Sequence, residues 1–427
     1  MIKSSGNNAG RLVPSTCGNI HRLKLCGTLC TALVFHGCSS SPLSPVSPAH
    51  IGPYSGDLVF AHTLEKIRVE ERLPSIASAI IVGGKIHFIA AVGTRLQGTD
   101  NWVKTNDRFL IGSCAKAFTA TLAGILVDEG LLSWDTTIKD IFPDMEMLPD
   151  YMPITIKQLL SHRAGLPKNL KEGQNTWSID FGFDRTRGST PQNLRQQYLE
   201  QTALLPLSYP PGKVVHYSNA GYIIAGAILE RVSGKPFEML REERIFQPLG
   251  ITTAGYGPPA DTERMRQPWG HYWDESKHVF SRFEAKPPSF MAPAGYLSIS
   301  LHDWAKFILA HMDIYPPGRR RLLTSDTLMT LHTPPPMEIW DINIGFDTDY
   351  ALGWFTKKTD DDHALIWHGG RGFAFNAVVV ADLTSRNAIL LVTNAEVPHI
   401  HPQLHLLQIV KKIKNRFLGE ALLPGIL

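Results

Sequence analysis

The stretch Ile111-Gly112-Ser113-Cys114-Ala115-Lys116-Ala117-Phe118 opens a long apolar run that continues to Asp128 and stops at Glu129-Gly130. The run predicts a buried helix whose first turn holds Ser113. Ser113 and Lys116 are three residues apart, so they share one face of that helix. A serine hydroxyl needs a nearby base to become a nucleophile, and an amine one turn along can be that base if burial or nearby cations lower its pKa. The free N–H groups of the first turn would stabilise a negative charge formed there.

Two further motifs follow along the chain. His216-Tyr217-Ser218-Asn219 stands just before an apolar helical run at 220–230 that ends at Gly234-Lys235-Pro236. Trp367-His368-Gly369-Gly370-Arg371-Gly372 stands between two strand-like runs. A serine three residues before a lysine is common in proteins of this size, so the interpretation depends on the ordered set of three motifs.

In this order and at these intervals, Ser113-x-x-Lys116, Tyr217-Ser218-Asn219 and His368-Gly369-Gly370 resemble the serine penicillin-recognising family. That family contains class C β-lactamases, DD-peptidases, D-aminopeptidases and related esterases. The stretches 159–167 and Pro210-Pro211-Gly212 also resemble it, and the resemblance covers roughly residues 55–417. It implies a serine hydrolase that cleaves an amide or ester bond through an acyl-enzyme and needs no cofactor.

The resemblance also implies roles for individual residues. Ser113 would be the acylated nucleophile, and Lys116 would take its proton. Tyr217 would relay protons to the leaving group and later activate water, which requires the Lys116 ammonium to lower its pKa. Asn219 would hold Lys116 and a substrate amide.

The third motif would form the other wall of the site. The resemblance makes the backbone N–H groups of Ser113 and Arg371 the oxyanion hole, and Gly369 and Gly370 the small residues against which substrate lies. Class C β-lactamases carry Lys-Thr-Gly here, whereas this chain has His368 in the lysine position. The histidine would be a neutral or weakly cationic donor, which argues against efficient β-lactam hydrolysis. The alternative for His368 is a packed residue at the end of a strand.

Other catalytic schemes fit the sequence less well. Neither Ser113 nor Ser218 lies in a Gly-x-Ser-x-Gly turn, and the chain has no His-Glu-x-x-His zinc motif, so we expect no metal. His162, His216 and His363 are interpreted as structural, and Trp367, Phe373 and Phe375 as core or pocket wall. A non-catalytic binding or sensor protein that keeps the fold is the second function class. Within the hydrolase class the substrate stays open between an ester, a D-amino peptide and a β-lactam. Its selection would rest with loops 168–190 and 251–290.

The strand-like runs lie near the two ends of the chain. Residues 76–82 and 86–92, joined by Gly83-Gly84-Lys85, predict a hairpin, and four more runs lie at 352–355, 364–367, 375–380 and 388–393. Helical spacing marks residues 58–71, 302–311 and 401–417. We therefore expect an α/β protein of the α+β type. One antiparallel sheet is built from both chain ends, flanked by helices, with an inserted and mostly helical subdomain at roughly 120–290. The hydrolase domain spans 55–417, and 418–427 is a tail.

The N-terminus has a different character. Basic residues precede the short apolar run 25–35, and Gly37-Cys38 is followed by a Ser/Pro-rich stretch, which predicts a signal peptide at 1–38 and a tether at 39–54. This succession of a basic flank, an apolar run, Gly37-Cys38 and a tether also resembles a bacterial lipoprotein signal. The resemblance implies that Cys38 is lipidated and that the lipid anchors the protein to a membrane. A plain cleaved signal or an overlong start is the alternative. We accordingly expect an exported protein of the bacterial envelope, in the periplasm or anchored to the membrane.

Composition narrows the set of partners. The chain has 427 residues, 43% hydrophobic and 19% charged, which suits a globular protein with a substantial core. Residues 1–37 hold four of the 42 lysines and arginines and no acidic residue, so 38 basic residues remain against 39 acidic ones. The formal charge of +3 therefore comes from the signal and is not a nucleic-acid footprint. We expect a small-molecule or peptide substrate and no nucleic acid; the oligomeric state stays open. Cys114 is the one cysteine outside the N-terminal segment, so it has no internal disulfide partner.

Overall fold

The computed structural model describes residues 54–167, 190–260, 265–284, 288–336, 339–340, 348–396 and 402–419. The described residues all belong to one compact unit. The expected signal, Cys38 and most of the tether lie outside the described residues, as do residues 168–189 of the first specificity loop and residues 420–427 of the tail. No helix in the described part of the chain is both long and apolar enough to cross a bilayer.

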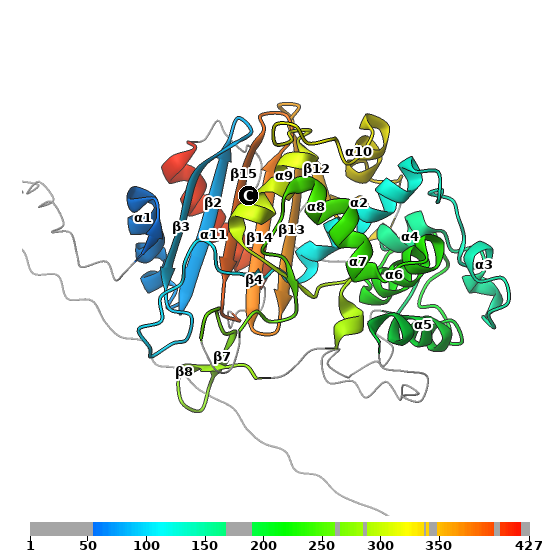
Figure 1. Ribbon diagram of the computed structural model, residues 1–427, viewed down its shortest axis with the longest axis horizontal. Helices are drawn as coiled ribbons and strands as arrows, with labels where there is room; N and C mark the ends of the chain where they lie inside the picture. Colours follow the sequence, from blue (N-terminus) through cyan, green and yellow to red (C-terminus); the bar gives the residue numbers. More distant parts are fainter. Residues whose placement is uncertain are drawn as a thin grey trace, which may run out of the picture. The chain divides into compact units, whose positions relative to one another are not determined.

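The principal sheet has eight strands, all paired antiparallel in the order β1-β3-β2-β15-β14-β13-β12-β11 (Figure 1). The strands are β1 (Ser55–Gly56), β2 (Ser75–Val82), β3 (Lys85–Gly93), β11 (Asp349–Tyr350), β12 (Phe355–Lys358), β13 (Ala364–Gly372), β14 (Phe375–Asp382) and β15 (Asn387–Thr393). The last strand pairs with β2, so that Leu390 lies opposite Ala79. The prediction of one antiparallel sheet built from both chain ends is confirmed.

The predicted strand at 352–355 is wrong in its first three residues, because β12 begins only at Phe355. Gly353 has φ +81°, which is left-handed backbone that bends the chain. A side chain at Gly353 would put its Cβ 2.9 Å from the Cα of Ala117. The glycine therefore marks a close approach to the helix that follows Ser113.

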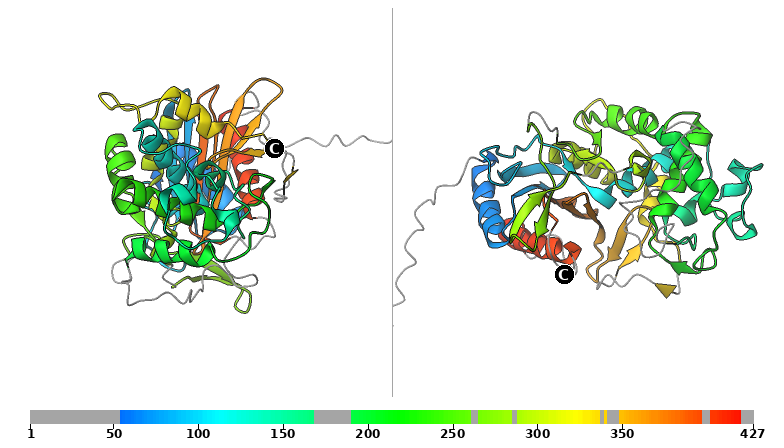
Figure 2. Two further views of the ribbon diagram at one scale, coloured as in Figure 1. Left: turned by 90° about the vertical axis from the view of Figure 1, so that its right-hand side faces the viewer. Right: turned by 90° about the horizontal axis from the view of Figure 1, so that it is seen from below.

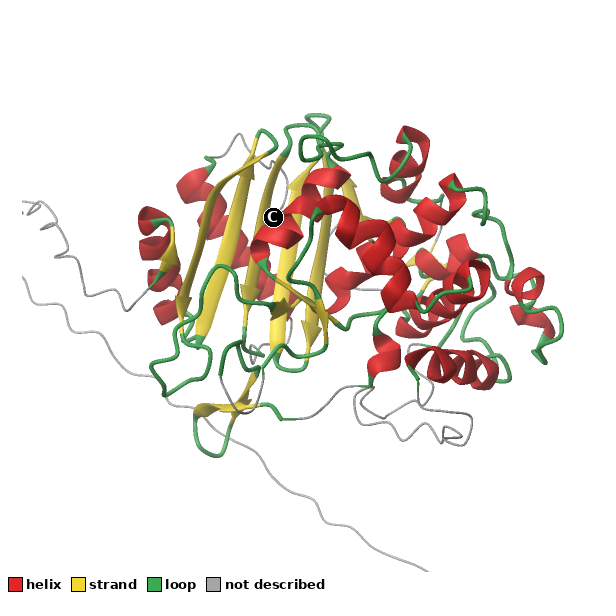
Figure 3. Cartoon of the chain, viewed as in Figure 1, coloured by secondary structure: helices red, strands yellow, loops and turns green. Residues whose placement is uncertain are grey.

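Helices cover both faces of the sheet (Figures 2 and 3). Helices α1 (Leu58–Glu70) and α11 (Pro402–Phe417), blue and red in Figure 2, cover one face, and α9 (Leu301–His311) covers the other. Successive strand residues point to opposite faces, so Ile80 and Val378 pack toward α1 and α11 while Ala79 and Val379 pack toward α9. Burial on both faces explains why the strand sequences are apolar almost throughout.

The stretch 111–128 forms two elements instead of one helix. A 3-10 turn, η1 (Gly112–Cys114), leads into α2 (Ala115–Asp128), and Gly112 enters it with φ +52°. Residues 115–126 of α2 are all buried, so the helix is enclosed on every side. Ser113 therefore precedes the α-helix by two residues and lies in the tighter turn.

The segment between β3 and β11 carries the remaining elements. Its helices are α3 (Ile138–Ile141), η2 (Pro149–Tyr151), α4 (Ile156–Leu160), α5 (Pro191–Thr202), α6 (Asn219–Ser233), α7 (Phe237–Arg241), a π-helical turn (Glu242–Phe246), α8 (Gln247–Leu249), η5 (Ser289–Met291) and α10 (Ser325–His332). Its short strands are β4 (Phe109–Leu110), β5 (Val214–Val215), β6 (Gly255–Tyr256), β7 (His271–Asp274), β8 (Val279–Arg282), β9 (Leu297–Ile299) and β10 (Ile339–Trp340). Helix α6 ends at Gly234 with φ +67°, as the Gly-Lys-Pro sequence predicts.

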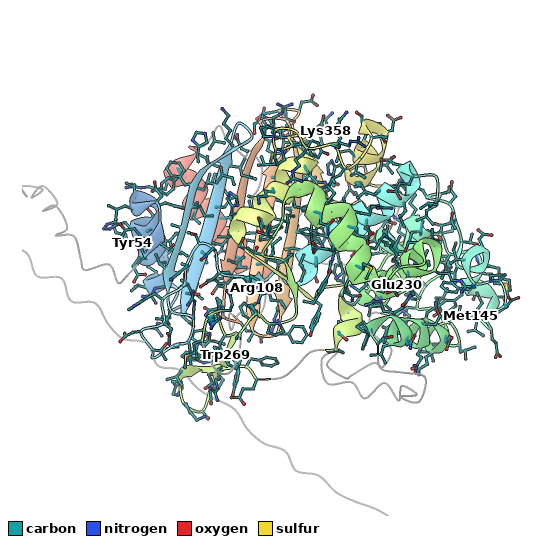
Figure 4. All side chains as sticks on the ribbon, in the orientation of Figure 1. Tyr54, Arg108, Met145, Glu230, Trp269 and Lys358 are labelled. Atoms are coloured by element: carbon teal, nitrogen blue, oxygen red, sulfur yellow. The ribbon has the colours of Figure 1, made fainter. Side chains whose placement is uncertain are left out.

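The β7–β8 hairpin lies in the loop 251–290, for which the sequence carries no readable motif. His271 anchors it: its N–H donates to the carbonyls of Ala374 and Asn394, and its Nε2 accepts from the N–H of Gln97. In Figure 4, Trp269 marks the entry to this hairpin, which projects beyond the end of the sheet. A loop expected to carry specificity therefore has regular structure, fixed to the turn between β13 and β14.

A buried ion network holds the helical part together. The Arg195 guanidinium of α5 binds both carboxylate oxygens of Glu230 in α6 at 3.1 and 2.6 Å, and both of Glu238 in α7 at 2.9 Å. Arg195 is fully buried, and Glu230, labelled in Figure 4 among the helices, is 3% exposed. Since α6 begins at Asn219, this network also fixes a residue of the candidate site.

We expect Arg195→Met to lower the free energy of unfolding by about 3–5 kcal/mol, because Glu230 would stay buried without a counter-charge. Urea denaturation followed by circular dichroism measures the loss. The matched control is Arg321→Met, whose ion pair with Asp313 is exposed on both sides and should contribute at most about 1 kcal/mol. Equal losses in the two variants would contradict the stabilising role of the network.

Candidate active site

The structure brings Ser113, Lys116 and Asn219 together, although Asn219 is 103 residues beyond the lysine. Lys116 Nζ lies 3.0 Å from Ser113 Oγ, 2.8 Å from Asn219 Oδ1 and 2.6 Å from the carbonyl oxygen of Ala294. The turn η1, the first turn of α2, the first residue of α6 and the segment before β9 supply these groups. Sequence reasoning missed Ala294, because a backbone carbonyl leaves no signal in the residue type.

Burial lowers the pKa of Lys116 from its ordinary 10.5 to about 7. The side chain is fully buried, and its Nζ contacts neutral oxygens and the rings of Tyr217 and Tyr222, whose centroids lie 4.9 and 5.4 Å away. A drop of this size corresponds to roughly 5 kcal/mol against the ammonium form, at 1.36 kcal/mol per pKa unit. Lys116 therefore loses its proton near neutral pH, as a base for Ser113 must.

The contacts of Lys116 also orient its lone pair. A neutral amine has two N–H donors and one acceptor site. Asn219 Oδ1 and the Ala294 carbonyl can only accept, so they take the two N–H bonds. The nitrogen lone pair therefore points in the remaining direction, toward Ser113 Oγ. This arrangement can accept the Ser113 proton directly.

Tyr217 is partly buried and hydrogen-bonds the Ser113 hydroxyl. We expected Lys116 to lower the pKa of Tyr217, and this expectation is wrong: burial raises it well above 10, with the Ser113 hydrogen bond only partly opposing. Burial penalises the phenolate just as it penalises the ammonium, and no stabilising charge from Lys116 offsets this penalty at Tyr217. Tyr217 is thus a phenol at neutral pH, suited to donating a proton to a leaving group.

Two glycines bring the nucleophile turn against β13. A Cβ on Gly370 would lie 1.9 Å from the carbonyl oxygen of Ile111 and 3.1 Å from the Ser113 nitrogen. A Cβ on Gly112 would lie 2.6 Å from the nitrogen of Arg371. The predicted oxyanion pair, the N–H groups of Ser113 and Arg371, is therefore brought together by contacts that only glycine permits. Gly370 must be small because the chain itself passes there, and not only to leave room for substrate.

The edge of β13 beside Ser113 is open in the described structure. Strand β12 pairs with Ala364–Trp367 of β13 and goes no further, whereas β14 pairs along Leu365–Gly372 on the other side. Along residues 368–372, β13 is therefore paired on one side only among the described strands, and its backbone groups on the other side have no strand partner. They include Gly369, Gly370 and Arg371, beside the nucleophile. The Arg371 guanidinium forms an ion pair with Glu396.

His368 does not offer the free donor that we expected. Its side chain is fully buried, its Nδ1 lies 2.7 Å from the Gly369 carbonyl, and its Nε2 lies 3.1 Å from the Tyr350 hydroxyl. Burial, assisted by the charge of Lys116, lowers its pKa to about 3, so the ring is neutral. His368 is packed, as in the alternative weighed for it, but it lies in the middle of β13 and not at the end of the strand.

The other candidates take structural positions. Cys114 is buried, its thiol donates to the His368 carbonyl at 3.3 Å, and burial raises its pKa. His162 Nδ1 accepts from the Ser218 N–H, and its ring packs 4.1 Å from that of Tyr217. His363 pairs with buried Asp382. Across the described residues, no group of three or more His, Cys, Asp or Glu side chains is placed to hold a metal ion.

Comparison with known families gives one match over most of the chain. The beta-lactamase family model matches residues 60–409. Among individual proteins, penicillin-binding protein 4 of Amycolatopsis lactamdurans is 29% identical over 344 residues, which cover 78% of this chain and 84% of that protein. An unguisins hydrolase of Aspergillus campestris is 24% identical over 346 residues, which cover 77% of this chain and 60% of the hydrolase.

Solved structures share the fold. The octameric penicillin-binding protein homologue from Pyrococcus abyssi superposes with a TM-score of 0.64 and 21% identity, covering 82% of this chain and 77% of that one. The D-amino acid amidase from Ochrobactrum anthropi superposes with a TM-score of 0.64 and 21% identity, covering 82% of this chain and 96% of the amidase. At these identities the likeness concerns the arrangement of sheet and helices.

The pKa of Lys116 predicts how the reactivity of Ser113 depends on pH. The neutral amine predominates above about pH 7, so labelling of Ser113 by a fluorophosphonate should be fast there and should fall as the pH drops through about 7. The pKa values of His368 and His162 lie well below pH 7, so neither histidine accounts for the fall in labelling rate. The measurement is the labelling rate between pH 5 and 9. A labelling rate that does not change over this range would contradict the assignment of Lys116 as the base. So would a fall in rate below pH 7 that persists in Lys116→Ala.

Proposed function

Because the chain belongs to the beta-lactamase family, a family of serine hydrolases, we propose that it cleaves an amide or ester bond through an acyl-enzyme on Ser113. One observation carries the proposal. The Lys116 amine is 3.0 Å from the Ser113 hydroxyl, and burial lowers its pKa to about 7. A protein that only binds its ligand has no need of a base at this cost in stability, so the geometry favours catalysis over a non-catalytic sensor.

In the proposed reaction Ser113 Oγ attacks the substrate carbonyl while its proton passes to Lys116 Nζ. The developing oxyanion is stabilised by the N–H groups of Ser113 and Arg371. Tyr217 then donates its phenolic proton to the departing nitrogen or oxygen, and the proton on Lys116 returns to the Tyr217 oxygen. Water attacks the acyl-enzyme by the reverse sequence of proton transfers and releases the acid. Asn219 holds Lys116 in place throughout.

We further propose that the leaving group is neutral. The third motif offers no cation to a substrate carboxylate, because His368 is buried, neutral and already bonded on both nitrogens. The nearby Arg371 is paired with Glu396. Peptides ending in D-Ala-D-Ala and β-lactams both carry a carboxylate on the leaving side. Simple amides and esters, the classes closest to the D-amino acid amidase and the esterase-like members, suit this site better.

We also propose export through the N-terminal segment, with lipid attachment at Cys38. The support is the sequence alone: a basic flank, the apolar run 25–35, Gly37-Cys38 and the Ser/Pro-rich stretch after it. The hydrolase would then act in the bacterial envelope, in the periplasm or held at a membrane surface. One acyl chain binds a membrane only marginally, so a stable anchor would need more than one.

The function is tested with residues 50–427 on a panel of short-chain esters, D-amino acid amides, D-Ala-D-Ala peptides and a chromogenic cephalosporin. We expect turnover of the neutral esters or amides, little or none of the carboxylate-bearing substrates, and a covalent fluorophosphonate adduct at Ser113 by mass spectrometry. Ser113→Ala should lose at least about 10³-fold in kcat and Tyr217→Phe about 10²-fold. The control is Ser218→Ala, a serine of the same motif whose hydroxyl donates to the Pro167 carbonyl. Labelling elsewhere, or no turnover and no label with any probe, would refute the mechanism.

The localisation proposal predicts that the full-length protein, expressed in a bacterial host, is processed at its N-terminus and fractionates with membranes. Cys38→Ser should abolish metabolic labelling with a radioactive fatty acid. Retention in the cytosol with residues 1–37 intact would contradict export. Membrane association that persists in Cys38→Ser would contradict the lipid attachment alone.

A further inference from the structure

Tyr350 lies behind the candidate site, at the second position of the short strand β11. It is fully buried, and its ring packs 4.6 Å from that of His162 and 4.7 Å from that of Phe355. Its hydroxyl lies 3.1 Å from His368 Nε2. Nothing in the three sequence motifs points to this residue, and the proposed reaction does not use it.

The hydrogen bonds of His368 determine which nitrogen carries the proton. Nδ1 lies 2.7 Å from the Gly369 carbonyl, which can only accept, so Nδ1 bears the hydrogen. A neutral imidazole has one N–H, so Nε2 must accept, and its partner is the Tyr350 hydroxyl. The Tyr350 hydroxyl has two acceptors within reach, and His368 Nε2 at 3.1 Å is closer than the Tyr222 oxygen at 3.5 Å, whose own proton goes to the Leu160 carbonyl.

The imidazole supports a stretch of strand that has few side chains of its own. Gly369 and Gly370 follow His368 directly, and β12 does not extend alongside them. The bond from Nδ1 to the Gly369 carbonyl joins the ring to the strand one residue before the Gly370 contact with Ser113. On the other side, the Cys114 thiol donates to the His368 carbonyl. His368 thus ties the open edge of β13 to the nucleophile turn.

We propose that Tyr350 is a positioning residue: its hydroxyl holds His368 as the Nδ1–H tautomer, and His368 in turn holds the Gly369–Arg371 edge against Ser113. Without that hydroxyl, Nε2 would be buried with no donor, which favours the ring turning away. That turn would release the Gly369 carbonyl and loosen the Arg371 N–H. The proposal rests on the hydrolase function above, and it assigns Tyr350 no contact with substrate.

The test compares Tyr350→Phe with Tyr222→Phe, a second buried tyrosine of the same cluster whose hydroxyl does not bond His368. The ¹⁵N signals of His368, identified by their absence in His368→Asn, report the tautomer without reference to activity. We expect Nδ1–H in the wild type and in Tyr222→Phe, and a changed pattern in Tyr350→Phe. For the best ester or amide of the panel, kcat should fall about 10-fold or more in Tyr350→Phe with KM nearly unchanged, because a misplaced oxyanion donor acts on the transition state.

The proposal would be overturned by Nε2–H in the wild type, by an unchanged ¹⁵N pattern in Tyr350→Phe, or by a changed pattern with unchanged kcat. A fall in kcat of equal size in Tyr222→Phe would also overturn it, since the effect would then be general loosening of the cluster. A wild type that turns over no substrate and takes no label refutes the hydrolase function instead, and in that case the ¹⁵N comparison alone decides the tautomer claim.

Discussion

The burial of one amine without a carboxylate beside it governs this structure. Lys116 is fully enclosed, and its partners are a serine hydroxyl, an amide oxygen and a backbone carbonyl. An acidic partner would hold the ammonium form and remove the base, whereas three neutral oxygens leave the pKa near 7. Excluding water from the amine requires that α2 be buried on every side, and this is why the sequence that follows Ser113 is so apolar.

The tyrosines and histidines around Lys116 are also kept in their neutral forms by burial. Burial raises the pKa values of Tyr217, Tyr222 and Tyr350 and lowers those of His162 and His368, so the whole cluster is neutral at physiological pH. Proton positions inside such a cluster follow from hydrogen-bond geometry and not from bulk pH. The direction of each bond, from Tyr350 to His368 and from His368 to Gly369, therefore becomes part of the architecture of the site.

The second wall of the site depends on the absence of side chains. Gly112 and Gly370 let the nucleophile turn and β13 pass at backbone contact, which brings the N–H groups of Ser113 and Arg371 together. The early end of β12 leaves the adjacent edge open. A hydrolase site of this kind thus combines a dry proton-transfer pocket on the helical side with an open strand edge on the sheet side.

The sequence alone determined the fold class and the principal residues of the candidate site. The apolar run from Ile111, the hairpin signals at one end and the strand runs at the other contain enough periodicity to predict one antiparallel sheet with an inserted helical part. The ordered motifs identified Ser113, Lys116, Tyr217 and Asn219, because side chains that carry chemistry must be of particular types at particular spacings. Tertiary structure decided what depends on surroundings. It decided that the pKa of Tyr217 is raised and that both nitrogens of His368 are hydrogen-bonded, one of them to the hydroxyl of Tyr350. It also placed the Ala294 carbonyl against Lys116. Burial and hydrogen-bond direction arise from segments distant in the chain, and no local pattern of residues encodes them.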